Sequence, residues 1–374
     1  MELKIMNFTA PCIFGLEGLV SDELKAMGAN DVLAENGRVF FSGDANILAR
    51  ANICSRFSER ILIVVGSFEA HTFDDLFEGT KALPWEEWLT EYDEFPVKGH
   101  SVNSDLFSVS DCQAIIKKAI VERLKSKYDI EWFEETGAKH QIHFSIMKNT
   151  VHLLIDSTGN GLHKRGYRPV ANDAPIKETL AAAMASLAHL RNYHTLYDPM
   201  CGSGTILIEG AMLAHNIAPG LNRAFAAERF EQIPFNVWEE ERERAKSLEI
   251  TDSEFKAYGS DIDENAIEIA KENAKRAGVD DKIGFFVADI KDFKQLSEKG
   301  TVICNPPYGE RMLSEKEVEG IIRQMGKLFV RERGWAYYII SPHEAFEDVF
   351  GRRADKRRKL YNGMIKCQLY SYFK

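Results

Sequence analysis

The stretch of this sequence best suited to chemistry is Asn305-Pro306-Pro307-Tyr308. Two prolines after an asparagine fix an extended, rigid backbone, so the Asn305 side-chain oxygen and a backbone carbonyl can point at one spot. Two acceptors around an NH2 group would orient its nitrogen lone pair toward an electrophile, and Tyr308 would stack on the ring that carries it. We therefore predict a reaction at an exocyclic amino nitrogen; the alternative is an ordinary turn. Cys304 is expected to be a buried strand residue, not a nucleophile.

A glycine-containing turn upstream could hold a nucleotide-like cofactor. The strand-like TLYDP leads into Met200-Cys201-Gly202-Ser203-Gly204-Thr205 and then into the helix-like ILIEGAMLA. Glycines at a strand-to-helix turn let the backbone approach a ligand, and the helix N-terminus presents unpaired N–H groups. Asp198 could bind an ammonium group of that ligand. A single GxG pattern is also typical of a tight turn.

Two acidic residues follow at the ends of predicted strands. KAYGSDI ends in Asp261-Ile262, and an acid there can accept both ribose hydroxyls. It comes 57 positions after Gly204 (261 − 204) instead of roughly 20, and we interpret residues 215–250 as a module inserted into the domain. IGFFVAD ends at Asp289, whose carboxylate could accept an adenine amino group beside Ile290. The alternative for this acid is a helix N-cap.

These motifs lie on one predicted sheet. From residue 174 onward helical segments alternate with short apolar strands, which predicts a parallel sheet with helices on both faces. The predicted strands are TLYDP, KAYGSDI, IGFFVAD, GTVICN and WAYYIIS. Two further strands around Asn362-Gly363 predict an antiparallel edge on that sheet.

The preceding residues predict two smaller α/β units. Residues 7–66 follow the order strand, helix, strand, strand, helix, strand of a ferredoxin-like unit, with a hairpin at Asn36-Gly37. The clearest helix of the second unit is 111–127, and a tight turn at Lys148-Asn149 joins its last two strands. The predicted domains are 1–66, 67–157, a linker at 158–173, and 174–374.

Composition limits the classes of protein. The 374 residues contain no apolar run near the roughly 20 needed to span a bilayer, and the N-terminus lacks the features of a signal peptide. Six cysteines lie far apart with no CxxC pair, which argues against a metal site and disulfides and for a reducing cytoplasm. The net charge of −10 argues mildly against nucleic acid as a partner.

In this order, DPMCGSGT, GSDID, VAD and NPPY resemble the class I S-adenosylmethionine methyltransferases that act on amino groups. STGNGLHKRGYR, APIKETLAAAM and NPPYGER resemble more closely the bacterial guanine-N2 methyltransferases of 23S rRNA that carry a THUMP domain. SDLFSVSDCQAIIKKAIVERL resembles the central THUMP segment. The resemblance implies a ferredoxin-like and THUMP arm that binds RNA, a Rossmann-like catalytic domain with a seven-stranded sheet, and S-adenosyl-L-methionine as cofactor. The implied partner is 23S rRNA or a ribosome precursor.

The resemblance also implies residue roles. The implied cofactor-binding residues are Thr179, Leu180, Asp198, Pro199, Met200, Cys201, Gly202, Ser203, Gly204, Thr205, Asp261, Ile262, Asp289, Ile290 and Asn305. The implied catalytic residues are Asn305, Pro306, Pro307 and Tyr308. Alternatives are a tRNA guanine-N2 methyltransferase, an adenine-N6 DNA methyltransferase, and a non-catalytic RNA-binding assembly factor.

In an acidic protein, RNA must bind at local basic patches. The predicted RNA-binding residues are Lys117, Lys118 and Lys125 on the arm, Lys164, Arg165 and Arg168 in the linker, and Arg357 and Arg358 near the C-terminus. The arm patch also includes Arg123 and Lys127, and the C-terminal patch includes Arg352, Arg353, Lys356 and Lys359. For the arm and the C-terminal patch, the alternative is a solvated surface.

Overall fold

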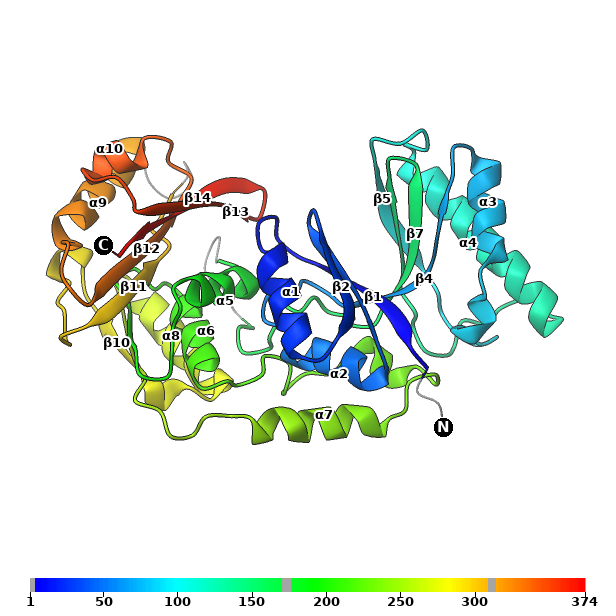
Figure 1. Cartoon of the computed structure of the whole chain (residues 1–374), viewed down its shortest axis with the longest axis horizontal. Coiled ribbons are helices and arrows are strands. Elements are labelled where there is room, and N and C mark those ends of the chain that lie inside the picture. The colour runs from blue at the N-terminus through cyan, green and yellow to red at the C-terminus, as the bar shows by residue number, and fades with distance from the viewer. Residues whose placement is uncertain (1–3, 170–175, 309–313, 374) are drawn as a thin grey trace.

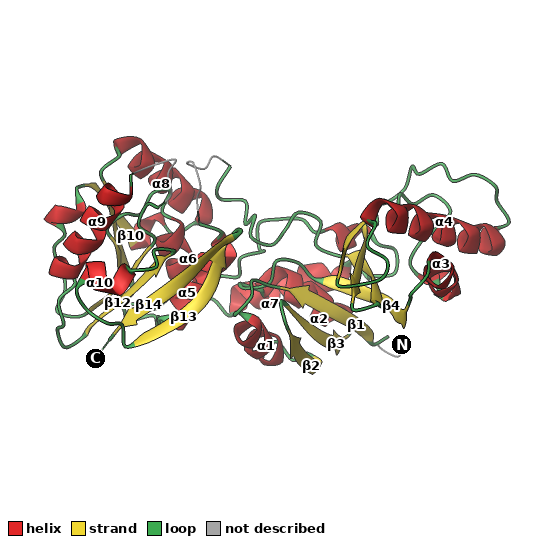
Figure 2. Cartoon of the chain, turned by 90° about the horizontal axis from the view of Figure 1, so that it is seen from above, coloured by secondary structure: helices red, strands yellow, loops and turns green. Residues whose placement is uncertain are grey.

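The computed structural model describes residues 4–169, 176–308 and 314–373. Two seven-stranded sheets with their helices lie side by side along the long axis of the molecule (Figure 1). Figure 2 shows the same two sheets from above. Within the described ranges, no helix is both long and apolar enough to cross a lipid bilayer.

The first sheet has the strand order β2-β3-β1-β4-β7-β6-β5. Its strands are β1 (Met6–Pro11), β2 (Asn30–Glu35), β3 (Arg38–Gly43), β4 (Leu62–Glu69), β5 (Val97–Val102), β6 (Ile142–Met147) and β7 (Thr150–Asp156). Its helices are α1 (Glu17–Ala26), α2 (Ala45–Cys54), α3 (Phe73–Ala82) and α4 (Val109–Tyr128). The strand and helix order predicted for residues 7–66 is confirmed. Strand β4 pairs with both β1 and β7, so one sheet runs across the predicted boundary at residue 66.

The turns of this sheet follow from residues that tolerate a left-handed backbone. Gly37 has φ +76° in the turn between β2 and β3, and Lys148 and Asn149 have φ of 50° and 67° between β6 and β7. Positive φ at both central residues suits a two-residue hairpin. Helix α4 extends the predicted 111–127 by a residue or two at each end and buries one apolar stripe, which includes Ile116 and Leu124.

The second sheet has the order β10-β9-β8-β11-β12-β14-β13. Its strands are β8 (Thr195–Asp198), β9 (Lys256–Asp261), β10 (Ile283–Val287), β11 (Gly300–Cys304), β12 (Trp335–Ser341), β13 (Lys356–Asn362) and β14 (Ile365–Tyr372). Its helices are α5 (Glu178–Leu187), α6 (Thr205–Ala214), α7 (Asn236–Ser247), α8 (Glu264–Ala277), α9 (Glu315–Leu328) and α10 (Phe346–Phe350). Strands β8 to β12 are parallel, and β14 and β13 add an antiparallel edge, as predicted.

The segment inserted between α6 and β9 binds the first sheet's helices. It contains α7, which lies along α2 (Figure 1). Arg50 of α2 donates from Nε to Glu241 Oε2 and from Nη2 to Glu241 Oε1, at 2.7 Å each. Phe230 stacks on His140, with ring centroids 3.9 Å apart. The insertion therefore fastens the catalytic domain to both N-terminal units.

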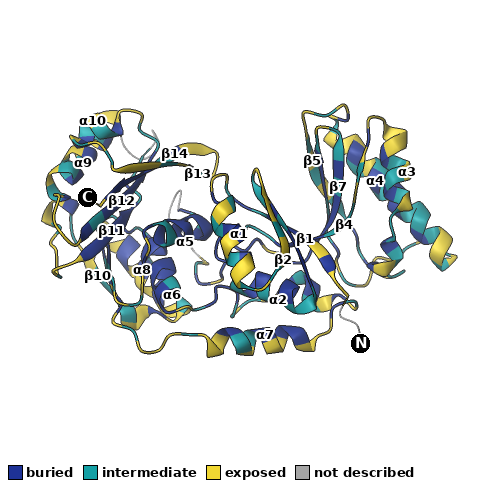
Figure 3. Cartoon of the chain, in the orientation of Figure 1, coloured by how far each residue is buried: buried dark blue, intermediate teal, exposed yellow. Residues whose placement is uncertain are grey.

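The described part of the predicted linker, residues 158–169, passes through a buried junction; 170–173 lie outside the described residues. Arg165 donates from Nη2 to the carbonyl of Arg56 at 2.6 Å and pairs with Glu209 of α6, with Nε 3.4 Å from Oε1. The Tyr167 hydroxyl donates to Glu209 at 3.0 Å. One apolar core runs through the junction into both sheets, seen as buried segments in Figure 3. The two sheets are therefore packed together.

Candidate active site

A cavity of about 1220 Å³ opens at the carboxyl ends of β8, β9, β10 and β11. Ligands of open α/β sheets bind at this edge. The predicted site residues that line it are Asp198, Pro199, Met200, Cys201, Gly202, Ser203, Thr205, Asp261, Ile262, Asp289, Ile290, Asn305, Pro306, Pro307 and Tyr308. All four motifs from the sequence thus meet in one cavity.

The glycine turn is held against the end of β9. Gly202 has φ +50°, and its N–H donates to Asp261 Oδ2 at 2.9 Å. Gly204 has φ +77°, and a side chain there would come within 3.2 Å of Phe285. The N–H of Asp263 donates to the other Asp261 oxygen at 3.1 Å. Asp261 therefore fixes the turn and still faces the cavity.

Asp198 is a buried carboxyl whose Oδ1 accepts a hydrogen bond from the N–H of Met200 at 3.2 Å. Burial raises the pKa of Asp198 well above its ordinary value, and the nearby charge of Asp261 adds to the effect. A buried carboxylate is stabilised by a cation. The site therefore suits an ammonium group at this position.

Asp289 is placed both to cap a short helix and to contact a ligand in the cavity. It caps the short helix Ile290–Asp292, accepting from Lys291 N at 2.9 Å, and its side chain also lines the cavity. The Lys291 ammonium lies 3.2 Å from Asp289 Oδ2. Ile290 beside it is 8% exposed, which gives the wall an apolar face.

Asn305 follows β11 and reaches into the same cavity. Its side-chain oxygen Oδ1 is buried and has no hydrogen-bond partner among the described residues. An unpaired buried acceptor costs about 1–3 kcal/mol. An N–H donor in the cavity would remove that cost, so the site is complementary to an amino group.

Tyr308 is held by the hairpin of β13 and β14. Its hydroxyl accepts a hydrogen bond from Asn362 Nδ2, and burial raises the pKa of Tyr308 to about 12. The hydroxyl is therefore neutral at physiological pH. Burial also raises the pKa of the Cys304 thiol well above its ordinary value, so this buried cysteine is not an anionic nucleophile.

Three predicted cofactor residues lie just outside the cavity wall. Thr179, Leu180 and Gly204 do not line it, whereas Ile176 and Lys177 do. Thr179 and Leu180 lie in the first turn of α5, and both are buried.

Lys177 is held by a residue of the first sheet's domain. Glu59 accepts from Lys177 Nζ at 2.9 Å and from the Thr179 hydroxyl at 2.7 Å. Burial opposes the ionisation of Glu59, but the nearby His163 ring, with Nδ1 at 3.3 Å, and the hydrogen bonds from Lys177 and Thr179 outweigh it and lower its pKa to about 2. The N-terminal domain thus positions one wall of the cavity.

Two further walls of the cavity were not predicted from the sequence. Glu317, Ile321 and Gln324 of α9 form one, and Asn362 and Ile365 of the β13–β14 hairpin form the other. The Asn362-Gly363 turn was visible in the sequence as a hairpin. Its contact with the cavity depends on the antiparallel pairing of β14 with β12, which no local pattern carries.

Two of the predicted RNA-binding arginines form ion pairs within the protein. Arg165 is 4% exposed and paired with Glu209, so the prediction that it contacts RNA is wrong. Arg168 donates from Nη1 to the Thr205 hydroxyl at 2.8 Å and pairs with Glu178 at 3.0 Å, with only 10% of its side chain exposed. It positions the start of α6 and is not available to RNA. Lys164 is exposed.

Of the three lysines predicted on the arm, two form ion pairs and one is exposed. Lys117 and Lys125 of α4 pair with Glu135 at 2.6 Å and Glu131 at 3.1 Å, while Lys118 is exposed. These ion pairs offset part of the positive charge on the arm.

The C-terminal pair also has partners. Arg357 pairs with Glu347 at 2.9 Å with 57% of its side chain exposed, and Arg358 donates to the Gly15 carbonyl at 3.1 Å. RNA binding by Lys117, Lys118, Lys125, Lys164, Arg357 and Arg358 stays a prediction.

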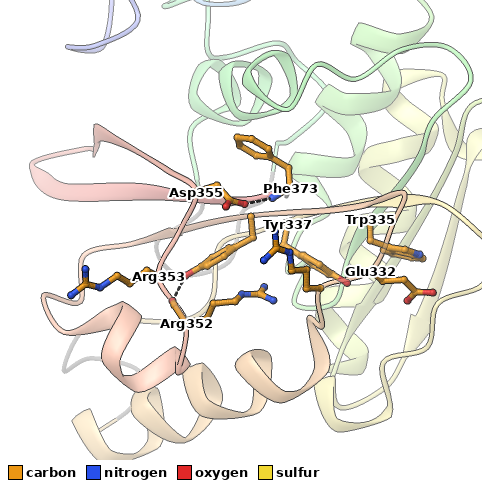
Figure 4. A pocket seen from close by; sticks show the side chains of 9 residues that line it. Glu332, Trp335, Tyr337, Arg352, Arg353, Asp355 and Phe373 are labelled. Atoms are coloured by element: carbon orange, nitrogen blue, oxygen red, sulfur yellow. Dashed lines mark hydrogen bonds between the residues drawn. The ribbon is translucent and has the colours of Figure 1, made fainter.

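A second, smaller cavity of about 90 Å³ lies at the start of β12 (Figure 4). Arg352 lies in its wall, donates to the Phe329 carbonyl at 2.9 Å and sits over the rings of Phe350 and Tyr372. Since Trp335, the first residue of β12, also lines it, this cavity is at the opposite edge of the sheet from the large one. Arg352 is structural.

Three side chains that could ligate a metal lie close together near α9. Glu315 and Glu319 of α9 and His343 bring ligand atoms within 4.8 Å of one another. Glu319 already accepts from Arg323. The sequence prediction of no metal stays a prediction.

Comparison with known proteins identifies the catalytic domain. Residues 165–371 match the family described as "RMKL-like, methyltransferase domain". The chain belongs to this family. Residues 7–62 match the ferredoxin-like domain of RlmL and residues 70–156 match the THUMP domain. The protein is therefore an RNA methyltransferase of the RMKL-like type, with a ferredoxin-like domain and a THUMP domain before the catalytic domain.

The relatives span the chain. YpsC of Bacillus subtilis (strain 168) is named as a proposed RNA methyltransferase. It is 45% identical to this chain, and the match covers all of this chain and 97% of the YpsC sequence. The ribosomal RNA large subunit methyltransferase K/L of Shewanella baltica (strain OS155) is 32% identical over 98% of this chain, which spans 53% of that longer protein.

Solved structures of relatives have the same fold. The structure of SMU.472 complexed with SAH is 40% identical over all of this chain and 99% of its own, with a TM-score of 0.93. A protein of Listeria monocytogenes, named a predicted N6-adenine-specific DNA methylase, is 47% identical over 99% of this chain and 96% of its own, with a TM-score of 0.93.

Proposed function

We propose that this protein transfers a methyl group from S-adenosyl-L-methionine to an exocyclic amino nitrogen of an RNA base, namely N2 of a guanine in 23S rRNA. The observation that carries the proposal is the buried Asn305 oxygen in the cavity, which has no hydrogen-bond partner among the described residues. The THUMP match and the relatives named rRNA methyltransferase support RNA over DNA, and the SAH complex of a 40% identical protein supports the cofactor. We propose the cytoplasm as its location and 1–66, 67–157 and 174–374 as its domains.

The cavity suits the proposed cofactor. Asp198 would hold its ammonium group, Asp261 its ribose, and Asp289 with Ile290 its adenine. When bound, S-adenosylmethionine supplies an electrophilic methyl group on a sulfonium. The volume of about 1220 Å³ leaves room for a base beside it.

The chain's own groups would orient the acceptor nitrogen. Asn305 Oδ1 and the Pro306 carbonyl would accept from the two N–H groups, which keeps electron density on nitrogen and stabilises positive charge as the C–N bond forms. Tyr308, neutral and held by Asn362, would stack on the ring. Orientation of this kind contributes roughly 7–11 kcal/mol in model reactions. The proton would leave to water or through the Pro306 carbonyl, since Asn305 is not a base.

The test is methyl transfer by purified protein to 23S rRNA, tRNA and DNA side by side, followed by mass spectrometry of the nucleosides. N2-methylguanosine from 23S rRNA is the expected product. N6-methyladenosine from DNA, or methylated tRNA only, would overturn the assigned substrate. A protein that binds the cofactor and 23S rRNA but transfers nothing would favour the non-catalytic alternative.

A further inference from the structure

Two aromatic rings meet where the loop after β1 approaches the β13–β14 hairpin. Phe14 is 56% exposed and Met364, at the hairpin tip, is 97% exposed. The rings of Phe14 and Tyr361 lie edge to face with centroids 6.2 Å apart. In Figure 1 the hairpin reaches across to the segment before α1, far from it in sequence. An exposed aromatic ring held in place by a second ring offers a surface on which a base can stack.

The Phe14 loop is built to hold its ring outward. The Glu17 carboxylate accepts from the N–H groups of Gly15 at 2.9 Å and Gly37 at 2.8 Å, which ties the loop to the β2–β3 turn. A side chain at Gly37 would lie 3.2 Å from the Phe14 ring. The ring therefore rests against the Gly37 turn, whose φ of +76° favours glycine, and 56% of Phe14 stays exposed.

The hairpin approaches this loop just as closely. Gly15 has φ +92°, and a side chain there would come within 2.9 Å of the Lys359 carbonyl. Arg358 donates to the Gly15 carbonyl at 3.1 Å. The two segments form a fixed seam in which the rings of Phe14 and Tyr361 contact each other edge to face.

This seam adjoins the catalytic cavity along β13, whose last two residues, Tyr361 and Asn362, project to opposite faces of the strand. Asn362, next to Tyr361, binds the Tyr308 hydroxyl and lines the cavity together with Gly363 and Ile365. Lys359 Nζ lies 5.3 Å from the centroid of the Tyr361 ring. A ring pair beside an ammonium group is the arrangement that binds single-stranded nucleic acid, with bases on the rings and a phosphate on the cation.

We propose that Phe14 and Tyr361 form a second nucleotide-binding site, which stacks the unpaired base next to the target while Lys359 contacts its phosphate. The proposal rests on the proposed function, because a base methylated at its amino group must leave the helical stack and its neighbour loses a stacking partner. Base–aromatic stacking is tolerant of sequence, so the site would hold the strand in register without selecting the neighbouring base.

The experiment uses a single-stranded RNA hexamer that carries one 2-aminopurine, whose fluorescence is quenched by stacking. The parental protein should bind and quench it. Phe14→Ala should weaken binding about tenfold and lose the quenching, and Phe14→Trp should restore both. Lys359→Gln should flatten the salt dependence by about one counterion, whereas Phe14→Ala should leave that slope unchanged.

The control is Phe235→Ala. This phenylalanine is 72% exposed at the start of α7, which lies on the other side of the molecule from the hairpin (Figure 1). The Phe235→Ala variant should bind the hexamer as the parental protein does. Phe14→Leu keeps the apolar contact and removes the ring, so it should behave as Phe14→Ala with an unchanged melting temperature.

The outcomes separate this site from the proposed function. A parental protein that neither binds nor quenches the hexamer would overturn the second site, as would a Phe14→Ala variant equal to Phe235→Ala. Neither result affects methyl transfer to 23S rRNA, which is measured separately. Conversely, hexamer binding that depends on Phe14 in a protein that methylates no RNA would support the site and overturn the proposed function.

Discussion

Asn305 combines a buried acceptor, unsatisfied by any described residue, with a place in the wall of the large cavity. A buried amide oxygen with no partner among the described residues is destabilising unless a ligand pairs with it. Asn305→Ala should therefore leave the fold intact and cofactor affinity unchanged, but reduce the rate of methyl transfer by about 100-fold or more, the effect of removing one transition-state hydrogen bond. Single-turnover transfer of a labelled methyl group and calorimetry of cofactor binding would measure the two effects. A parental rate would remove Asn305 from the reaction.

Asp261 is expected to contribute to cofactor binding, separately from the role of Asn305 in methyl transfer. It accepts from the N–H of Gly202 and faces the cavity, so Asp261→Ala should weaken cofactor binding by at least about tenfold, or about 1.4 kcal/mol. Asp44→Ala is the matched control, because that carboxylate caps α2 and is not among the residues that line the cavity. An unchanged dissociation constant for the Asp261 variant would exclude it from the cofactor site.

The buried Asp198 carboxyl predicts a pH dependence. Its raised pKa means that the ligand-free protein holds a proton there below the folded pKa. Binding of a cationic cofactor group requires the ionised form, so affinity should fall as pH decreases below that pKa, and binding should release a proton. Calorimetry in two buffers of different ionisation enthalpy would detect the release. Asp198→Asn should abolish it and weaken binding.

The raised pKa of Asp198 also predicts that the ligand-free protein loses stability as pH rises, although cofactor affinity increases. A carboxyl whose folded pKa exceeds the unfolded value destabilises the protein as pH rises from the unfolded pKa through the folded one. Asp198→Asn should therefore raise the melting temperature of the ligand-free protein at neutral pH, by about 2–4 °C for each kcal/mol. A lower melting temperature would mean that the carboxylate is already compensated.

At the scale of elements, local patterns carried most of the fold. The Asn36-Gly37 and Lys148-Asn149 turns, the α4 stripe and the five parallel strands were predictable because each depends on neighbouring residues. The cofactor walls at strand ends followed from the same periodicity. The walls from α9 and the hairpin did not, since they arise from pairings between distant segments.

The junction after β7 shows what a composition-based interpretation misses. Glycine and basic residues suggested a linker, but Arg165 is buried because Glu209 and the backbone carbonyls of Ser55 and Arg56 compensate its charge. Removing one partner of a buried ion pair costs about 3–5 kcal/mol. Arg165→Met should lower the urea midpoint accordingly, whereas Lys164→Met, exposed next to it, should change stability by less than about 0.5 kcal/mol. Equal midpoints would contradict the junction's role.

For the whole molecule, the net charge of −10 means that any RNA surface works against a repulsive background. The structure narrows the candidates, because Arg165, Arg168 and Arg352 serve the fold. On the C-terminal edge, Lys356, Arg357 and Lys359 are exposed on β13, in the hairpin whose turn lines the cavity. Phosphate contacts there would carry an affinity that falls steeply with salt.

Reversing Arg357 and Arg358 to Glu should therefore weaken RNA binding and flatten its salt slope by about two, since each phosphate that the protein no longer neutralises removes roughly 0.9 from that slope. Arg358 also holds the Gly15 loop, so part of the weakening would come from the seam. The control reverses Lys275 and Arg276, both exposed in the last turn of α8, which changes net charge equally. Fluorescence anisotropy across a salt series would measure the RNA affinity of the two double variants. Cofactor affinity is expected to be unchanged in both variants. If the two double reversals weaken binding to the same degree, net charge explains the effect and the C-terminal edge does not contact RNA.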